Sequence, residues 1–373
     1  MKKKAIVAGH ICLDITPVFP GRPVETVSDL LQPGRLIHMK EADVHTGGSV
    51  ANTGLAMKFF GADVTLMGKV GNDPFGAMIR SILNRHGAEE GLLVADGEST
   101  SYSVVLAIPG IDRIFLHNPG ANDTFSAEDL PAEALEEAAL LHFGYPPVMA
   151  GMYRENGKEL LKLMKRAKEA EAATSLDMAA VDPSSEAGQA DWYGILERVL
   201  PFVDFFVPSV EELMFMIDRD RFEDLQKRAA GRDLTEILDV EKDVRPLADT
   251  CMKMGAKVLV IKCGAPGLYY RTAGESALGQ TGKKLNLDAA AWADREGFEK
   301  SYVPERILSG TGAGDTSIAA FLTAVLQGET LETSMHLAAA AGACCVSSYD
   351  ALSGLKSFDE MKDKIACDWP KNK

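Results

Sequence analysis

The chain has 373 residues, which is enough for one large domain or two ordinary ones with an ample core. Its 39 lysines and arginines stand against 54 aspartates and glutamates, and the net charge of −15 argues against nucleic acid or an anionic membrane as a partner. The six cysteines show no metal-like or CxxC spacing, and no apolar run has the length of a signal-peptide core or a membrane span. We therefore expect a reduced, cytoplasmic protein. A phosphorylated ligand is not excluded, because it needs only a few local donors.

The first part of the chain alternates between strands and helices. A buried strand at 5–8 is followed by a helix that opens at Gly47-Gly48, with Ser49 as its N-cap, and then by a strand at 63–67. The order helix, Gly-Ala, strand recurs, with the glycine ending the helix, at Gly61-Ala62, Gly87-Ala88 and Gly255-Ala256. Recurring βα units predict a mostly parallel sheet with helices on both faces.

Two stretches interrupt this alternation. Residues 15–45 are rich in proline, glycine and polar residues, and they predict a hairpin or flap outside the main sheet. Residues 99–117 predict two strands around a tight turn. We expect the two stretches to pair and to form a small second sheet.

The second part of the chain returns to regular elements. We expect helices at 133–140, 157–171, 316–326 and 334–347, and strands at 141–145, 174–177, 203–207 and 257–262. The strand at 174–177 ends in an acid, Asp177. The highly charged residues of 218–245 predict solvated surface helices.

The stretch from Ser309 to Asp315, Ser-Gly-Thr-Gly-Ala-Gly-Asp, leads into an apolar helix. Its glycines allow a turn with positive φ, and the unpaired N–H groups of a helix start suit a phosphate. Asp315 would repel a phosphate, unless it accepts the proton of a hydroxyl that attacks the phosphorus. The structural alternative is dipole compensation by an acid in the first helical turn. Neither a Walker loop nor the dinucleotide fingerprint is present.

Six separated motifs share the order found in one family: Asp14 after the first strand, Gly47-Gly48 with Asn52, the glycine-rich segment 68–76, Ser209-x-x-Glu212, Cys263-Gly264-x-x-Gly267, and Gly312-Ala-Gly-Asp315. In this order the chain resembles the ribokinase-like (PfkB) carbohydrate kinases over nearly its whole length. The resemblance implies a three-layer α/β/α sandwich with a mostly parallel central sheet and a small β-sheet lid. It implies a single domain, 1–373, with lid segments at 12–45 and 97–120 and a homodimer formed through the lid.

The same resemblance implies transfer of the ATP γ-phosphate to an alcohol of a sugar or sugar-like molecule. Asp315 is then the general base, and the amides of Gly312, Ala313 and Gly314 form an anion hole. The substrate contacts it implies are Asp14, Gly47, Gly48, Asn52, Arg113 and Tyr145. The nucleotide contacts are Ser209, Glu212, Lys262, Gly264 and Gly267, with Glu212 acting on Mg²⁺ through water. Such a reaction depends on positioning and charge stabilisation, which these groups can provide.

The sequence departs from the family pattern at three places. Ser309-Gly310 replaces an Asp-Thr pair that belongs to a monovalent-cation site, so the resemblance does not extend to K⁺ activation. Ser209 replaces an asparagine, and Tyr145 follows the strand that often ends in a substrate-binding glutamate. A tyrosine there suggests a substrate that stacks on a ring or is hydrogen-bonded by it. The segment 175–183 is also a candidate for nucleotide or substrate contact.

Two alternative functions stay open. One is a nucleoside kinase of the same fold, in which Tyr145 and Phe115 stack on a base. The other is a catalytically weak sugar- or nucleotide-binding regulator. Structural roles are open for single residues as well: Asn52 could bond to the local backbone, Asp14 could cap a turn, and Glu212 could lie on the surface.

Overall fold

Eight strands build the central sheet of the computed structural model, which describes residues 2–21, 23–111 and 113–372. The strands lie in the order β14 (Glu296–Lys300), β13 (Gly267–Thr272), β12 (Val258–Lys262), β11 (Phe205–Phe206), β10 (Ala173–Asp177), β9 (Ala138–Gly144), β1 (Lys4–Gly9) and β4 (Asp63–Met67). The pairs from β12 to β4 are parallel, whereas β13 and β14 run antiparallel at one edge. The expected mostly parallel sheet is confirmed.

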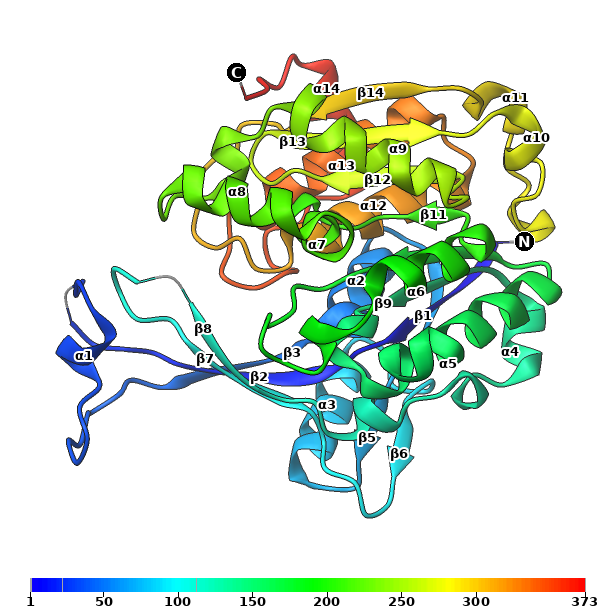
Figure 1. The fold of residues 1–373 in the computed structure, drawn as a ribbon. Coiled ribbons are helices and arrows are strands. Elements are labelled where there is room, and N and C mark those ends of the chain that lie inside the picture. The colour runs from blue at the N-terminus through cyan, green and yellow to red at the C-terminus, as the bar shows by residue number, and fades with distance from the viewer. Residues whose placement is uncertain (1, 22, 112, 373) are drawn as a thin grey trace.

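Helices cover both faces of this sheet, which gives three layers (Figure 1). Alternate side chains of β1 enter two separate cores, as the period of a strand requires. One core includes residues of α2 (Gly48–Phe59), α3 (Pro74–Arg85), α10 (Glu275–Leu278), α11 (Ala289–Trp292), α12 (Ala313–Gln327), α13 (Leu331–Cys345) and α14 (Phe358–Ala366). The other includes residues of α4 (Ala132–Glu137), α5 (Ala150–Glu169), α6 (Trp192–Val199), α7 (Val210–Ile217), α8 (Arg219–Ala229) and α9 (Arg245–Lys253). Within the described ranges, no helix has both the length and the apolarity needed to cross a membrane.

A separate sheet of four strands projects from this body (Figure 1). Its order is β3 (Ala42–Gly47), β2 (Cys12–Pro17), β7 (Tyr102–Leu106) and β8 (Ile114–Asn118), and the short helix α1 (Val27–Leu30) lies at its far end. Strand β2 pairs antiparallel with β3 and parallel with β7, so the two irregular stretches do form the expected small second sheet. Residue 112, inside the second stretch, lies outside the described residues. The short strands β5 (Lys69–Gly71) and β6 (Leu93–Ala95) form a third sheet.

Several helix starts differ from the predicted ones, and the contacts at two of them show the reason. Ser49 is not an N-cap: α2 has Gly47 as its N-cap, and the buried hydroxyl of Ser49 lies 3.5 Å from Nε2 of His142. Helix α13 begins at Leu331, ahead of the predicted start at 334, because the hydroxyl of Thr330 accepts the N–H of Thr333 and caps the helix. The start of α13 is visible in the sequence, because threonine is a favoured cap residue. The start of α2 has no such signal.

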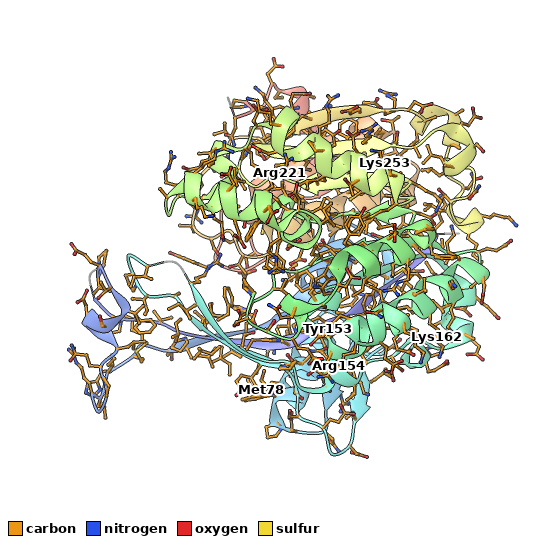
Figure 2. The ribbon with its side chains drawn as sticks, viewed as in Figure 1. Met78, Tyr153, Arg154, Lys162, Arg221 and Lys253 are labelled. Carbon is orange, nitrogen blue, oxygen red and sulfur yellow. The ribbon has the colours of Figure 1, made fainter. Side chains whose placement is uncertain are left out.

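Helix α5 has an interruption that its polar pattern does not reveal. From Arg154 to Gly157 the backbone leaves the helical region, and Glu155 and Asn156 adopt positive φ. The guanidinium of Arg154 donates two hydrogen bonds to the carboxylate of Glu186, at 2.7 and 2.6 Å. Figure 2 shows Arg154 next to Tyr153 on the surface of the molecule. The helix predicted at 157–171 is the regular part that follows this interruption.

Candidate active site

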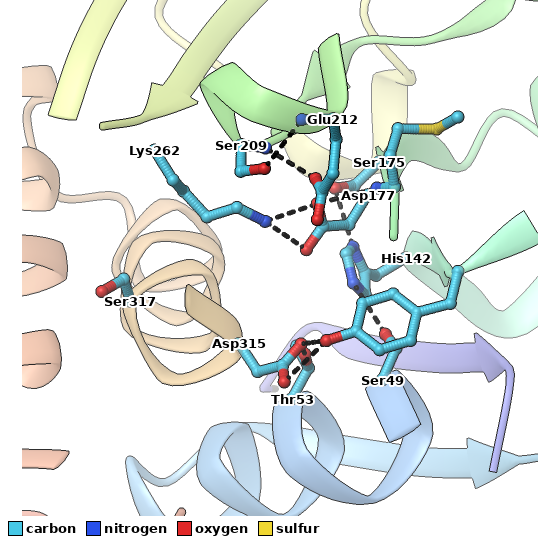
Figure 3. A network of polar contacts seen from close by, with 12 residues as sticks. Ser49, Thr53, His142, Ser175, Asp177, Ser209, Glu212, Lys262, Asp315 and Ser317 are labelled. Atoms are coloured by element: carbon cyan, nitrogen blue, oxygen red, sulfur yellow. Dashed lines mark hydrogen bonds and ion pairs between the residues drawn. The ribbon is translucent and has the colours of Figure 1, made fainter. Parts of the chain in front are cut away.

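Several polar side chains meet at the edge of the central sheet where its parallel strands end (Figure 3). Asp177 and Lys262 are the last residues of β10 and β12, and Tyr145 directly follows β9. Helix α12 begins beside them and carries Asp315 in its first turn. Open α/β sheets bind their ligands at this edge, so the cluster is a candidate active site.

Asp315 is a buried carboxylate with three side-chain donors. The Tyr145 hydroxyl donates to its Oδ1 at 2.7 Å and Oδ2 at 2.9 Å, and the Asn52 amide donates to Oδ2 at 2.9 Å. The Thr53 hydroxyl lies 3.4 Å from Oδ1. Burial raises the pKa of Asp315 above its ordinary value, and the charge of Lys262 together with the bonds from Asn52 and Tyr145 partly opposes this. The carboxylate of Asp315 is therefore held in place by three side-chain donors, and its pKa lies above the ordinary value.

Tyr145 reaches Asp315 from a strained position. Its φ of +69° lies in the left-handed region, which is uncommon for a residue with a side chain, and Pro146 follows it. Burial, followed by the charge of Asp315, raises the pKa of the Tyr145 phenol well above its usual range. The phenol therefore keeps its proton and acts as a hydrogen-bond donor to the carboxylate.

The turn before α12 has a left-handed glycine and, in the described part of the chain, backbone amides without a protein acceptor. Gly312 has a φ of +76°, and a β-carbon built on it would lie 2.4 Å from that of Ala351. The Ala313 amide donates to the carbonyl of Gly310 at 3.3 Å, whereas the amides of Gly312 and Gly314 have no protein acceptor among the described residues. Unpaired amides at a helix start form an anion site. Only a glycine fits at the Gly312 position of this turn.

Asp14 lies on strand β2 of the projecting sheet, next to the glycine pair that starts α2. A β-carbon on Gly47 would lie 2.1 Å from Oδ2 of Asp14, so the missing side chain of this glycine makes room for the carboxylate. Burial raises the pKa of Asp14, while its contact with the Cys12 thiol, 3.3 Å from Oδ1, lowers it. Gly48, which follows Gly47 in the chain, is the first residue of α2 and has a φ of +84°.

The projecting sheet also reaches the glycine-rich turn. The guanidinium of Arg113, just ahead of β8, donates a hydrogen bond to the hydroxyl of Thr311 and lies 5.9 Å from the ring centre of Phe115. The Thr311 amide in turn donates to the hydroxyl of Ser309 at 3.1 Å. The atypical residue Ser309 therefore serves to order the turn, and Arg113 links the turn to the small sheet.

Lys262 and Asp177 form a buried ion pair near Asp315. The ammonium of Lys262 donates to both oxygens of Asp177, at 2.6 and 2.7 Å, and the Asp177 side chain is 0% exposed. Burial, together with the charges of Glu212 and Asp315, raises the pKa of Asp177 to about 7 against the opposing effect of Lys262.

Ser209 and Glu212 form a capping box at the start of α7. The Ser209 amide donates to Oε2 of Glu212 at 2.8 Å, and the Glu212 amide donates to the Ser209 hydroxyl at 3.3 Å. Gly264 and Gly267 lie in the turn from β12 to β13, where the Gly267 amide donates to the carbonyl of Gly264 at 3.2 Å. Ser209 pairs with Lys262 across the sheet, and the two glycines follow Lys262 in the chain. The hydrogen bonds named here stabilise the helix start and the turn.

Comparison with known proteins identifies the family. The sequence matches the pfkB family carbohydrate kinases over residues 7–357. The chain belongs to this family. It is 24% identical over 302 residues to an uncharacterized sugar kinase of Archaeoglobus fulgidus, with 81% of this chain and 98% of that protein covered. It is 26% identical over 331 residues to fructokinase-1 of Oryza sativa subsp. japonica, with 84% and 86% covered. A solved structure with the same fold is Arabidopsis thaliana ribokinase complexed with ribose and ATP, at a TM-score of 0.69, 19% identity and coverage of 97% and 98%.

This carbohydrate kinase therefore gathers most of its predicted site residues at one edge of the sheet. One further member of the cluster, Thr53, has no role predicted from the sequence and no signal beyond its place next to Asn52 on α2. Asp177 is predicted as the acid at the end of a strand and as part of the candidate segment 175–183. Both contacts depend on which strands and helices are neighbours in space.

The donor set of the kinase site fits a magnesium ion carried with a nucleotide. In the part of the chain that the structure describes, no three His, Cys, Asp or Glu side chains gather as a metal site. Mg²⁺ usually keeps several waters and binds one or two carboxylates together with substrate phosphates. Of Glu212 and Asp177, Glu212 fits that pattern better, because Lys262 donates to both oxygens of Asp177 while only Oε2 of Glu212 accepts the Ser209 amide.

Proposed function

We propose that this carbohydrate kinase transfers the γ-phosphate of ATP to a hydroxyl of a small sugar or sugar-like substrate, with Asp315 as general base. One observation carries the proposal: a buried, three-fold hydrogen-bonded carboxylate lies in the first turn of a helix, beside the acceptor-free amides of Gly312 and Gly314. Phosphoryl transfer to an alcohol requires a base next to an anion site. The likeness to a ribokinase complexed with ribose and ATP supports ATP as the donor.

In this proposal each group has one task. Asp315 accepts the proton of the substrate hydroxyl while the oxygen attacks the γ-phosphorus. The amides of Gly312 and Gly314 donate to the oxygens of the transferred phosphoryl group at the positive end of α12, and the Ala313 amide joins them when it releases the Gly310 carbonyl. Bound Mg²⁺ supplies charge neutralisation of the phosphates, and Glu212 holds it through water.

The remaining site residues bind the two substrates. Asp14, Gly47, Gly48 and Asn52 hold the sugar hydroxyls, and a carboxylate with a carboxamide suits neighbouring hydroxyls because one accepts and the other also donates. Arg113 closes over the substrate from the projecting sheet, which acts as a lid and excludes water. The nucleotide lies against the glycines of the β12–β13 turn, Gly264 and Gly267, with Ser209 as a further donor, and its γ-phosphate faces Lys262.

The test is a panel of sugars, sugar phosphates and nucleosides, each incubated with the enzyme, ATP and Mg²⁺ while ADP release is measured. We expect acceptor-dependent ADP release with a sugar or sugar-like compound. Release with a nucleoside alone would favour a nucleoside kinase of the same fold. Tight ligand binding without ADP release from any acceptor would contradict the proposal and indicate a binding regulator.

Removing the Tyr145 hydroxyl is expected to move the pH dependence of the reaction. The bond from Tyr145 lowers the pKa of Asp315, so Tyr145→Phe raises that pKa further. Activity requires the ionised carboxylate and falls as the pH drops through this pKa. The acid limb of kcat should therefore move to higher pH in Tyr145→Phe, as rates measured across pH would show. Tyr193→Phe, at an exposed tyrosine of α6, is the control and should leave the limb unchanged.

We also propose that the enzyme forms a homodimer through the projecting sheet. The side chains of Phe115 and Leu116 on β8 are 56% and 53% exposed, although they are large and apolar. Replacing both by serine is expected to give a monomer in analytical ultracentrifugation. Phe59→Ser, at an equally exposed phenylalanine of α2, is the control and should leave the dimer intact. A wild-type monomer at micromolar concentration would contradict the proposal.

A cytoplasmic location is part of the same proposal. All six cysteines are free thiols, and five of them are buried. Free thiols are typical of reducing compartments.

A further inference from the structure

Lys262 places a positive charge inside a cluster of carboxylates. Its side chain is only 12% exposed, and its ammonium is held by both oxygens of Asp177. Burial acts to lower the pKa of Lys262, but the charges of Asp177, Glu212 and Asp315 raise it overall, so the ammonium stays charged. One cation thus faces three acids, and Figure 3 shows it on the same side of the site as Glu212 and above Asp315.

The lysine also lies against the turn that forms the anion site. A β-carbon built on Gly314 would lie 3.3 Å from Cδ of Lys262 and 3.9 Å from its Nζ. The aliphatic part of Lys262 therefore packs across the first turn of α12, beside the acceptor-free Gly314 amide. A phosphoryl group bound by the Gly314 amide would therefore lie within reach of the Lys262 ammonium.

The ion pair is held in place by the arrangement of the strands. Lys262 ends β12 and Asp177 ends β10, and β11 between them has only two residues, Phe205 and Phe206. Residues 207–209, which follow β11, stay hydrogen-bonded to both neighbouring strands, so the ion pair spans the width of this segment. A buried ion pair is a poor source of stability, because desolvation of both charges offsets their attraction. Its place at the reacting edge of the sheet points to a role in the chemistry.

We propose that Lys262 is a catalytic residue that contacts the transferred phosphoryl group, and that Asp177 is the positioning residue that holds Lys262 beside Gly314. The proposal rests on the proposed kinase function. In the step, the sugar oxygen forms a bond to the γ-phosphorus and its proton passes to Asp315. The bond from the γ-phosphorus to the bridging oxygen breaks, and that oxygen keeps the electron pair as part of ADP. Lys262 neutralises charge on the phosphoryl oxygens while it shares its remaining hydrogen bonds with Asp177.

The test compares binding of a transition-state mimic with binding of the product. Calorimetry measures the affinity for Mg²⁺–ADP with and without aluminium fluoride, which imitates the phosphoryl group in transit. Lys262→Met is expected to lower kcat by about 10²–10³-fold, as removal of one transition-state donor does. The gain in affinity from aluminium fluoride should be lost, while the affinity for ADP and the KM for the sugar change less than threefold. Lys262→Arg, which keeps the charge, should recover part of the loss.

The same strand supplies a matched control. Lys257, the residue just before β12, is also buried and contacts a fully buried acid, Asp204, at 3.0 Å, while Lys168 contacts the same acid at 2.9 Å. Lys257→Met removes a buried lysine and its contact with an acid that Lys168 still holds, far from the reacting groups, so kcat and the aluminium fluoride effect should stay at wild-type values. If Lys262→Met fails to fold because Asp177 is left unpaired, Asp177→Asn/Lys262→Met removes both charges and should show the same loss of kcat.

Two results would overturn the proposal. One is an active wild type whose Lys262 variants keep kcat and the aluminium fluoride effect within threefold. The other is an equal loss of affinity for ADP with and without aluminium fluoride, which would make Lys262 a ground-state nucleotide contact. Failure of the kinase function itself is distinguishable, because the wild type would then release no ADP with any acceptor.

Discussion

Asp315→Asn is expected to lower kcat about 10²–10⁴-fold, the usual contribution of a positioned general base. An asparagine fills the same space and can still accept a hydrogen bond from Tyr145 or Asn52, so the fold should persist. It cannot accept the proton of the attacking hydroxyl. Steady-state kinetics give kcat, and calorimetry should show ATP affinity within a few-fold of the wild type.

A matched variant separates chemistry from helix stability. Asp220 lies in the first turn of α8, as Asp315 does in α12, but on a surface helix away from the site. Asp220→Asn should leave kcat unchanged and alter the unfolding temperature only slightly, because the interaction of one exposed acid with the helix dipole is small. Full turnover in Asp315→Asn, with product confirmed as a sugar phosphate, would rule out the proposed base.

Gly312→Ala is expected to have the second largest effect. A left-handed φ costs a residue with a β-carbon about 1–2 kcal/mol, and the new methyl group would meet the β-carbon of Ala351 at 2.4 Å. The turn must therefore move, and its amides move away from the phosphoryl oxygens. We expect kcat to fall at least about 10²-fold, as for the loss of an oxyanion donor, together with a lower unfolding temperature.

Gly310 supplies the control for this prediction. It lies in the same turn, but beyond its chain neighbours no other heavy atom of the described residues lies within 4 Å of a β-carbon built on it. Gly310→Ala should therefore fold and turn over like the wild type. If Gly312→Ala is as active as Gly310→Ala, the geometry of the turn has no part in catalysis and the anion site must lie elsewhere.

The main features of the fold could be predicted from local patterns. Glycine-terminated helices followed by short apolar strands indicate βα units, and the parallel sheet follows from them. Some helix starts could not be predicted in the same way. Ser49 is a favoured cap residue, but its hydroxyl instead faces His142 of a neighbouring strand. That choice depends on tertiary contacts, which override local propensity.

The candidate site could be predicted only for residues that lie together in one sequence motif. The glycine-rich turn and Asp315 stand together in the sequence, so their proximity is given by the chain. The contact of Tyr145 with Asp315 is not, because it requires the left-handed backbone at Tyr145 and the placement of β9 next to α12. The pair of Lys262 and Asp177 likewise depends on the strand order, because β11 separates their two strands in space.

The proposed base is tested most directly by the pH dependence of kcat in the wild type and in Asp315→Asn. Burial raises the pKa of Asp315, so wild-type kcat should fall tenfold per pH unit below a pKa that lies above the ordinary value for aspartate. The residual rate of Asp315→Asn, measured at high enzyme concentration, should be independent of pH over the same range. An acid limb that persists unchanged in Asp315→Asn would show that another group accepts the proton.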